Sequence, residues 1–567
     1  MNKYKILSTF VASLFLFSGC YDLDRVPSDK LDSGNFFKTQ DHADQAMMGV
    51  YNAMQYNDAF GEQFSMDCLG GIGMGYDPAS YAVVQRGTYD VKEGTVLNKY
   101  KTFYEGIARA NIVLQNINKC EMSSELIAQY TGEAKFMRGL FYFALLDFFG
   151  GVPIYDESIV IADNFNNLTE PRSSAEEVRS FILKDLDAAI ASLPAQWNDA
   201  NKGRATSGAA TALKGKVLLF NKQYAEAAAC FEAVVNSGNY ALYNSYENLF
   251  KPGGDDSNEM IFAIQNMGGV GTDIGMPMTF YMGTRASFGS CWNNVMAATD
   301  FVDSYEWKDG RPFDWEEVVP GYTTDDKIKD ATFRADVEKK SIVKAYPEAK
   351  DKLLEMYDQR DPRMAASIIL PYTMYKGWYS NAPMDCEYVI GKEGQDDGHG
   401  LIRVNGNYEN YLWRKFVAEY DMDGAINNRE DTPINFPLIR YADVLLMLAE
   451  CDNELGKQAE AVALINQVRA RVNMPRLNSG PAWLSANSKD EVFQRIKHER
   501  AVELAAEGHS FSDMRRWGLL ETLNGKDEKG FTGKTYYTRV VKSRDYLWPI
   551  PANEIEKNTA LTQNPGW

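Results

Sequence analysis

The sequence predicts a mostly α-helical protein in which paired helices form a scaffold and a long, loop-rich region bears the binding residues. Apolar residues recur at steps of three and four from Ala43 to Met54, the pattern of a helix with one buried face. The pattern returns further along the chain, at about 98–118, 124–149, 175–193 and, as two helices, 207–237. Between about Tyr240 and Phe436 it fades, and Gly, Pro, Asn and Asp divide the sequence into short pieces. Such irregular regions usually carry binding residues on a rigid scaffold.

Residues 1–19 are expected to be a lipoprotein signal peptide. Lysines precede an apolar run from Ile6 to Phe17, which is too short to span a bilayer because a stable helix needs about 20 apolar residues. The run closes on Ser18-Gly19-Cys20, which resembles a bacterial lipobox in which Cys20 is acylated and becomes the mature N-terminus. Asp22 and Asp24 resemble the signal that sends Bacteroidetes lipoproteins to the outer cell surface. The alternative is a signal peptide cut elsewhere, with Cys20 incidental.

A second irregular stretch, from Phe60 to Gly94, contains GGIGMG at Gly70 to Gly75. A glycine-rich segment can cradle a phosphate when it joins a strand to a helix. Here Tyr76-Asp77-Pro78 follows as a turn, so we expect a mobile loop instead.

The helix expected from Ala175 has start and stop signals. Ser173 to Glu176 are expected to form a capping box, in which a serine oxygen accepts an N–H of the first turn and the glutamate reaches back. Pro194 ends the helix. The buried stripe consists of apolar residues at steps of four, namely Val178, Ile182, Leu186 and Ile190.

Two segments share a spacing that predicts packed helix hairpins. In each, a small residue is followed twelve positions later by alanine and sixteen positions later by a large apolar residue: Gly215, Ala227 and Phe231, then Ala449, Ala461 and Ile465. Small residues let paired helices approach closely, and the large residue fills the groove against the next pair, as in tetratricopeptide hairpins. Such hairpins stack into a scaffold and do no chemistry themselves. Unrelated amphipathic helix pairs are the alternative.

Composition limits the classes of partner and cofactor. A formal net charge of −19 would repel a phosphate backbone, so no nucleic-acid partner is expected. No cofactor is expected, and the sequence does not identify a metal. The histidines include no pair with metal-ligand spacing: His42, His399, His498 and His509. The cysteines after Cys20 form no CxxC pair, and we interpret them as small buried apolar residues.

The stretch EGHSFSDMRRWG, Glu507 to Gly518, raises the question of a hydrolase because it holds a histidine, serines and an aspartate. A Ser-His-Asp triad needs a serine on a strained turn and an oxyanion hole, and no G-x-S-x-G occurs here. We therefore predict a structural role. A helix should break at Gly508, the arginines should pair with buried carboxylates, and Trp517 should anchor the packing.

This stretch, within ERAVELAAEGHSFSDMRRWG, resembles the C-terminal signature of SusD/RagB-like outer-membrane lipoproteins. Further segments resemble the family in the right order along nearly the whole chain: PRSSAEEV to DLDAAIASLP, GRATSGAATALKGKVLLF, VVNSGNYAL, NEMIFAIQ, DSYEWKDGRP, QRDPRMAASII, FPLIRYADVLLMLAECDNELG, INQVRARV, LWPIPANEI and QNPGW. Ser510 departs from the family, which usually has arginine after the histidine. The departure puts one ion pair in doubt and leaves the fold unaffected.

The resemblance implies a SusD-like fold with tetratricopeptide-like hairpins and an irregular ligand-binding subdomain. It also implies a binding protein with no catalytic residues that acts as the lid of a SusC-like TonB-dependent transporter, capturing oligosaccharides at the cell surface for import. The protein should then be anchored to the outer membrane by lipid at Cys20. The expected domains are 1–19 as signal peptide, 20–239 as N-terminal helical region, 240–436 as irregular insertion with the ligand site, and 437–567 as the C-terminal region completing the fold.

Aromatic platforms with polar groups at their edges suit sugars, which present apolar C–H faces and hydroxyls. The expected ligand-contacting residues are aromatics of the two irregular stretches: Trp292, Trp315, Trp378 and Tyr379 from the insertion, and Tyr76 and Tyr81 from the early stretch. No residue-by-residue family correspondence supports these six, because the family's ligand positions vary with substrate. Tryptophans within family motifs are expected to be packing residues, namely Trp307, Trp517, Trp548 and Trp567.

Two rival functions are kept. A RagB-like peptide-import protein would share the fold and the transporter but use charged groups and backbone hydrogen bonds in its cleft. A surface glycoside hydrolase would need two carboxylates about 5 to 10 Å apart across a cleft. Acidic pairs such as Asp396-Asp397 and Glu316-Glu317 are the candidates for it, and the resemblance argues against this function.

Overall fold

A computed structural model of the chain describes residues 36–76, 78–160, 168–267, 275–338, 342–392, 401–402 and 409–567. The expected signal peptide with Cys20, and also His399 and Asp396-Asp397, lie outside these residues. In the described part of the chain, no helix is both long enough and apolar enough to cross a membrane.

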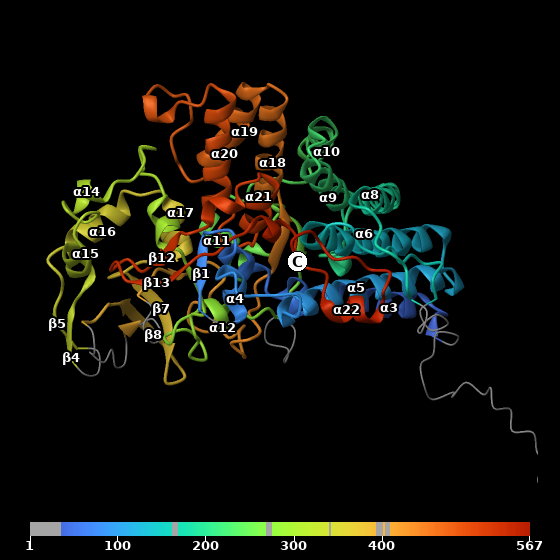
Figure 1. The fold of residues 1–567 in the computed structure, drawn as a ribbon, viewed down its shortest axis with the longest axis horizontal. Helices are drawn as coiled ribbons and strands as arrows, with labels where there is room; N and C mark the ends of the chain where they lie inside the picture. Colours follow the sequence, from blue (N-terminus) through green and yellow to red (C-terminus); the bar gives the residue numbers. More distant parts are fainter. Residues whose placement is uncertain are drawn as a thin grey trace, which may run out of the picture.

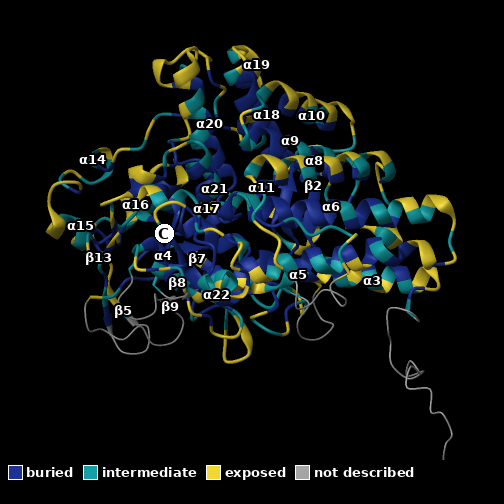
Figure 2. Cartoon of the chain, turned by 45° about the vertical axis from the view of Figure 1, so that its right-hand side comes forward, coloured by how far each residue is buried: buried dark blue, intermediate teal, exposed yellow. Residues whose placement is uncertain are grey.

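The longer helices form the right-hand half and the top of the molecule in Figure 1. They are α3 (Gln40–Asn52), α5 (Gly94–Asn116), α6 (Ser124–Phe149), α8 (Ala175–Ser192), α9 (Ser207–Phe220), α10 (Tyr224–Asn236), α18 (Tyr441–Glu454), α19 (Gln458–Arg471) and α20 (Lys489–Glu503). Helix α6 packs against both α5 and α8, and its second half is buried on nearly every side, as the dark blue of Figure 2 shows. The helical pattern read from the sequence is therefore confirmed.

The predicted helix hairpins are present and lie next to one another. Helices α9 and α10 pack together, α18 and α19 do the same, and α10 packs on α18. Gly215 faces Phe231 so closely that a Cβ at Gly215 would lie 2.6 Å from the ring. The turns also match, because Lys222 and Gly456 both take positive φ, 61° and 82°, seven residues after the small residue of their hairpin. The shared spacing thus indicates a shared backbone geometry.

Helix α8 begins with the expected capping box, but one residue later than predicted. Its N-cap is Ser174, whose side chain accepts the N–H of Glu177, and the Glu177 carboxylate in turn accepts the Ser174 N–H at 2.7 Å. Ser173 and Ser174 are both followed three residues later by a glutamate, but the helix begins at Ala175, so Ser174 is the N-cap, whereas the Ser173 N–H donates to the Val152 carbonyl at 3.2 Å.

The irregular region fills the left of Figure 1 with short helices and small sheets. Its helices are α11 (Tyr246–Leu249), α12 (Met278–Met282), α13 (Thr299–Asp303), α14 (Trp315–Val318), α15 (Asp326–Phe333), α16 (Lys350–Asp358) and α17 (Pro362–Ser367). Its sheets are β4–β5 (Asp336–Glu338, Ile342–Ala345), β6–β10 (Ile368–Ile369, Leu412–Trp413) and β7–β8–β9 (Met374–Tyr379, Ala382–Tyr388, Leu401–Ile402). Strands β2 (Met260–Ile264) and β11 (Phe436–Arg440) pair antiparallel and bring the two ends of the region together.

The C-terminal part completes the molecule with short elements after α20. They are α21 (Ser510–Arg516), the hairpin β12–β13 (Asp527–Lys529, Thr535–Thr538) and α22 (Ala552–Lys557). Helix α22 lies near α5 along the lower edge of the molecule in Figures 1 and 2.

A buried ion network ties the irregular region to the C-terminal helices. Arg440, at the end of β11, is fully buried and contacts Glu259 at 2.8 Å, Glu503 at 2.7 Å and Glu507 at 2.7 Å. Arg363 of α17 reaches Glu503 from another side at 3.2 Å. Buried charges are tolerated only when they are paired, so this network holds α17, the β2–β11 sheet and α20 in one arrangement.

Candidate functional site

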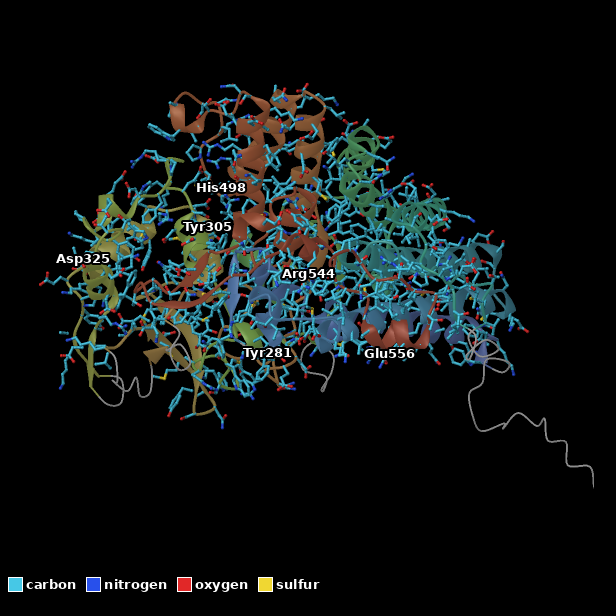
Figure 3. The ribbon with its side chains drawn as sticks, viewed as in Figure 1. Tyr281, Tyr305, Asp325, His498, Arg544 and Glu556 are labelled. Carbon is cyan, nitrogen blue, oxygen red and sulfur yellow. The ribbon has the colours of Figure 1, made fainter. Side chains whose placement is uncertain are left out.

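Four of the expected ligand-contacting aromatics lie at or near the surface on neighbouring segments. Trp292 is 42% exposed and Tyr379 36% exposed, while Tyr76 and Trp378 are partly buried. We call Tyr76, Trp292 and Trp378, with Phe280 and Phe288 packed against the two tryptophans, the aromatic surface. Tyr379 follows Trp378 on strand β7 and therefore projects from the opposite face of that strand. Figure 3 labels Tyr281 of α12, the helix that also carries Phe280, at the lower edge of the molecule.

The early stretch is fastened to the insertion by backbone pairing. Strand β1 (Gly73–Gly75) pairs antiparallel with β3 (Val295–Ala297), and the Tyr76 hydroxyl donates a hydrogen bond to the Trp292 carbonyl at 3.0 Å. The expectation of a mobile loop at Gly73–Gly75 is wrong, because these residues are a buried strand. Gly75 has no room for a side chain, since an added Cβ would lie 2.0 Å from the Ser80 Cβ. These glycines therefore serve close packing.

The hairpin β7–β8 is docked on the loop between α12 and β3. The Trp378 N–H donates to the Ala286 carbonyl at 2.7 Å, and its ring lies 5.3 Å from that of Phe288. Gly377 permits this approach, because an added Cβ would lie 2.6 Å from the Ala286 oxygen. The backbone thus sets the position of Trp378 independently of its ring.

Two guanidinium groups border the rings. Arg429 lies 4.6 Å from the Phe280 ring centroid and donates to the carbonyls of Gly289 and Ser290 at 2.8 Å each. Arg285 lies 6.0 Å from the Trp292 ring. The aromatic surface therefore combines ring faces with hydrogen-bond donors at their edges, an arrangement that can stack on and orient a polar ligand.

The structure places Tyr81 and Trp315 in the core, away from the aromatic surface. Tyr81 is 2% exposed and its ring packs against Trp548. Trp315 is 5% exposed and stacks on Tyr322 at 4.0 Å. We leave both out of the proposed site, because rings buried to this degree offer a ligand almost no surface.

Sequence reasoning missed Phe280, Phe288 and the two arginines. Phe288 lies in the same loop as Trp292, so the sequence could have indicated it as a further aromatic of this site. Arg429 comes from a segment more than a hundred residues away. Only the fold brings Arg429 to Phe280.

The stretch EGHSFSDMRRWG is a structural junction, as predicted. Ser510 and Ser512 donate to the carboxylates of Asp67 and Asp147 at 2.7 and 2.6 Å, whereas the Nδ1 of His509 lies 3.4 Å from the Lys216 ammonium. Burial, and then the nearby Lys216 charge, lower the pKa of His509 to about 4. A neutral histidine joined to a lysine, with each serine held by a separate carboxylate, lacks the proton relay of a triad.

The arginines of this stretch pair with carboxylates, also as predicted. Arg515 binds Asp147 at 2.6 Å and Arg516 binds the buried Asp513 at 2.8 Å. The Trp517 indole donates to Glu450 at 3.0 Å. At the position where arginine is usual, Ser510 instead hydrogen-bonds Asp67.

The carboxylates of Glu316 and Glu317 are both engaged in local contacts. Glu316 accepts backbone N–H groups of Gly321 and Thr323 at 2.6 and 2.8 Å, and Glu317 pairs with Arg311. Glu316 thus serves the turn that follows α14, whereas Glu317 pairs with the segment that precedes it. Among the residues that the structure describes, no cluster of three or more His, Cys, Asp or Glu could hold a metal ion.

Comparison with known proteins places this fold in a single family. A family model described as "SusD family" matches residues 258–567, more than half of the chain, and one described as "Starch-binding associating with outer membrane" matches residues 23–219. A curated relative, SusD-like protein P2 of Formosa agariphila, is 25% identical and is covered completely, as is this chain. The starch-binding protein SusD of Bacteroides thetaiotaomicron is 23% identical over 77% of this chain and 72% of its own.

Solved structures share the fold. A SusD-like carbohydrate-binding protein of Bacteroides fragilis superposes with a TM-score of 0.76 at 22% identity, over 93% of this chain and all of that one. A laminarin-binding SusD-like protein gives a TM-score of 0.62 at 23% identity, over 94% of this chain and all of that one.

Proposed function

The chain belongs to the SusD/RagB family, and from this premise we propose that it is a cell-surface lipoprotein that binds oligosaccharides and delivers them to a SusC-like TonB-dependent transporter. On this proposal it is lipid-anchored at Cys20 in the outer membrane and is not an enzyme. On the same proposal, the helices of 20–239 and 437–567 form the scaffold, and 240–436 provides most of the ligand contacts.

The aromatic surface is the observation that carries the proposal. Trp292 exposes more than a third of its area, and the partly buried rings of Tyr76 and Trp378 lie on neighbouring segments, so aromatic side chains gather here instead of being scattered singly. Sugar rings fit such platforms because their C–H faces stack on aromatic faces while their hydroxyls reach the neighbouring polar groups. The names of two relatives support the same ligand class, since one is a starch-binding and the other a laminarin-binding protein.

The transporter is proposed as partner on different grounds. Stacked hairpins offer a broad, rigid surface, and a lipid tether in the same membrane raises the local concentration of the two proteins. A lid that binds sugar loosely would then release it directly into the transporter.

The test is calorimetry of the full-length protein in mild detergent with a panel of plant and host oligosaccharides, and with short peptides. Trp378→Ala and Trp292→Ala should each weaken binding about 5- to 30-fold, since an aromatic contact contributes about 1 to 2 kcal/mol. Trp483→Ala is the matched control, because Trp483 is 40% exposed but lies before α20, away from the aromatic surface. The Trp483→Ala variant should bind each oligosaccharide as tightly as the unaltered protein does.

Thermal unfolding of each variant separates lost binding from lost packing. If a tryptophan is part of the core, replacing it with alanine should lower the free energy of unfolding by about 3 to 5 kcal/mol. Binding of peptides without any sugar would favour a RagB-like import protein. Release of reducing ends during the titration would revive the glycosidase.

A further inference from the structure

A cavity of about 410 Å³ lies beside the β7–β8 hairpin and is lined by an unusual group of cations. Lys251, Lys376 and Arg414 all converge on the single carboxylate of Glu419, at 3.4, 3.5 and 3.1 Å. They come from three separate segments of the irregular region. Burial raises the pKa of Glu419, but attraction to Lys251, Arg414 and Lys376 lowers it by more, so this carboxylate is charged.

Arg414 uses only part of its hydrogen-bonding capacity. Its Nε donates to Glu419 at 3.1 Å, but within the described part of the chain its terminal nitrogens reach only the carbonyls of Ala365 and Met374, at 3.5 and 3.4 Å. Good N–H···O bonds measure about 2.7 to 3.2 Å, so these two contacts are weak. A guanidinium whose two parallel donors are poorly engaged, at the wall of a cavity, is suited to a carboxylate or sulfate that accepts both.

The two lysines also retain donors. Each ammonium has three N–H groups, and the 3.4 and 3.5 Å separations from Glu419 are longer than strong charge-assisted bonds. Lys251 has a closer partner in Glu247 at 2.8 Å, whereas Lys376 is 54% exposed and has Glu419 as its nearest carboxylate. Lys415, the fourth cation of the wall, is committed to the buried Glu507 at 2.6 Å.

Carboxylates near the cavity limit where an anion can bind. Glu247 occupies Lys251, and Asp423 is exposed at the rim. Arg414 and Lys376 share the single carboxylate of Glu419, so their side of the cavity keeps an excess of positive charge and is the favourable one.

This side adjoins the aromatic surface. Lys376 and Trp378 alternate with the buried Gly377 on β7 and so project from the same face, two residues or about 7 Å apart. The Tyr420 N–H donates to the Lys376 carbonyl at 2.7 Å, which holds the cavity wall against the strand. A ligand stacked on Trp378 can thus place a neighbouring group against Lys376 and Arg414.

We propose that this cavity binds the carboxylate or sulfate ester of an acidic oligosaccharide, with Arg414 and Lys376 as the anion contacts and Trp378 as the platform for the adjoining sugar. The inference rests on the proposed glycan-binding function and narrows its substrate class. Such a site gives specificity, because a neutral sugar offers the two cations no new partner. The chain as a whole has a net charge of −19 and repels anions, so an acidic ligand is favoured where cations gather.

The experiment pairs each acidic ligand with a neutral ligand of the same backbone. Full-length protein in mild detergent is titrated with a hexuronate oligosaccharide and its methyl ester, and with a sulfated oligosaccharide and its desulfated form. We expect one acidic ligand to bind about 10- to 100-fold more tightly than its neutral counterpart, and the preference to shrink as salt is raised. Which pair shows the preference distinguishes a carboxylate from a sulfate.

Variants assign the preference to the cavity. Arg414→Gln and Lys376→Gln should each remove most of the preference for the acidic ligand and leave the affinity for its neutral counterpart unchanged. If Arg414→Gln misfolds, Lys376→Gln still tests the site, because Lys376 is exposed on a strand face and its replacement should not disturb the fold. Lys489→Gln is the matched control, since Lys489 is 51% exposed and ion-paired but lies on α20.

Each remaining outcome decides between the two proposals. Equal binding of charged and neutral partners would overturn the acidic-sugar site and leave the glycan-binding function standing, as would an acidic preference that both cavity variants retain. Binding of short acidic peptides with no binding of any oligosaccharide would overturn both proposals in favour of peptide import. The absence of binding to any neutral or acidic glycan would likewise overturn both.

Discussion

Replacing Arg440 with methionine tests whether the buried ion network holds the irregular region on the helices. Methionine keeps an unbranched apolar chain but removes the guanidinium, which donates to Glu259, Glu503 and Glu507 at 2.7 to 2.8 Å. Removing one partner of a buried pair typically costs about 3 to 5 kcal/mol, because the remaining charge is left without compensation.

The surrounding contacts place the expected loss near the lower end of this range. Glu507 keeps Lys415 at 2.6 Å, and Glu259 keeps Arg471 at 3.1 Å. Glu503 keeps both Arg471 and Arg363. Since every carboxylate retains a cation, we expect Arg440→Met to lower the free energy of unfolding by about 3 kcal/mol.

The assay is equilibrium unfolding in urea, followed by tryptophan fluorescence. The free energy of unfolding of Arg440→Lys should lie between those of the unaltered protein and of Arg440→Met. Lysine restores the charge but lacks the planar guanidinium that serves three carboxylates. Lys489→Met, which breaks the exposed pair with Glu454, should change stability little. If Arg440→Met proves no more destabilising than Lys489→Met, the network is not what holds these elements together.

Further predictions concern the anchor, the transporter, a buried histidine and a close backbone approach. Cys20→Ala should release the protein from membranes and abolish palmitate labelling, whereas persistent anchoring would contradict lipidation there. A mild-detergent pull-down should recover a large TonB-dependent barrel, and recovery of the protein alone in several detergents would count against this partner. His509 has a folded pKa of about 4, below its unfolded value of about 6.5, so the unfolded state binds more protons between these values. Stability from His509 should therefore be complete above pH 6.5 and decline as pH falls toward 4, by at most about 3 kcal/mol; a His509→Gln variant with the same pH profile as the unaltered protein would refute this. Gly377→Ala should weaken glycan binding by displacing the hairpin from the Ala286 carbonyl, and unchanged affinity would show that the docking is not needed.

Helical elements were predictable from the sequence because their signals are local. The apolar period marks α6 and α8, serine caps mark their starts, and the common spacing after Gly215 and Ala449 marks the two hairpins. The family motifs added the order of the elements and the fold. The one-residue error at Ser174 arose because Ser173 and Ser174 are each followed three residues later by a glutamate.

The candidate site was predictable only in part, because its members meet through tertiary structure. Exposed Trp292 and buried Trp315 lie in equally irregular sequence, and nothing local distinguishes them. The glycines of 70–75 suggested a loop because a strand of three residues leaves almost no periodic signal, and its partner β3 lies more than two hundred residues away. The convergence of Lys251, Lys376 and Arg414 is invisible for the same reason.

The way the rings are held bears on how such a surface can change its ligand. Backbone pairing positions the segments: β1 with β3, and the Trp378 N–H with the Ala286 carbonyl. The side chains that face solvent contribute little to this framework, since Trp292 and Tyr379 leave more than a third of their area uncovered. Replacing an exposed ring should therefore alter affinity while the fold persists, whereas replacing Gly75 or Arg440 should disturb the framework itself. Substitution of the exposed rings can therefore change the ligand specificity without destabilising the scaffold. Because different residues determine the fold and the ligand, the sequence predicts the fold more readily than the ligand.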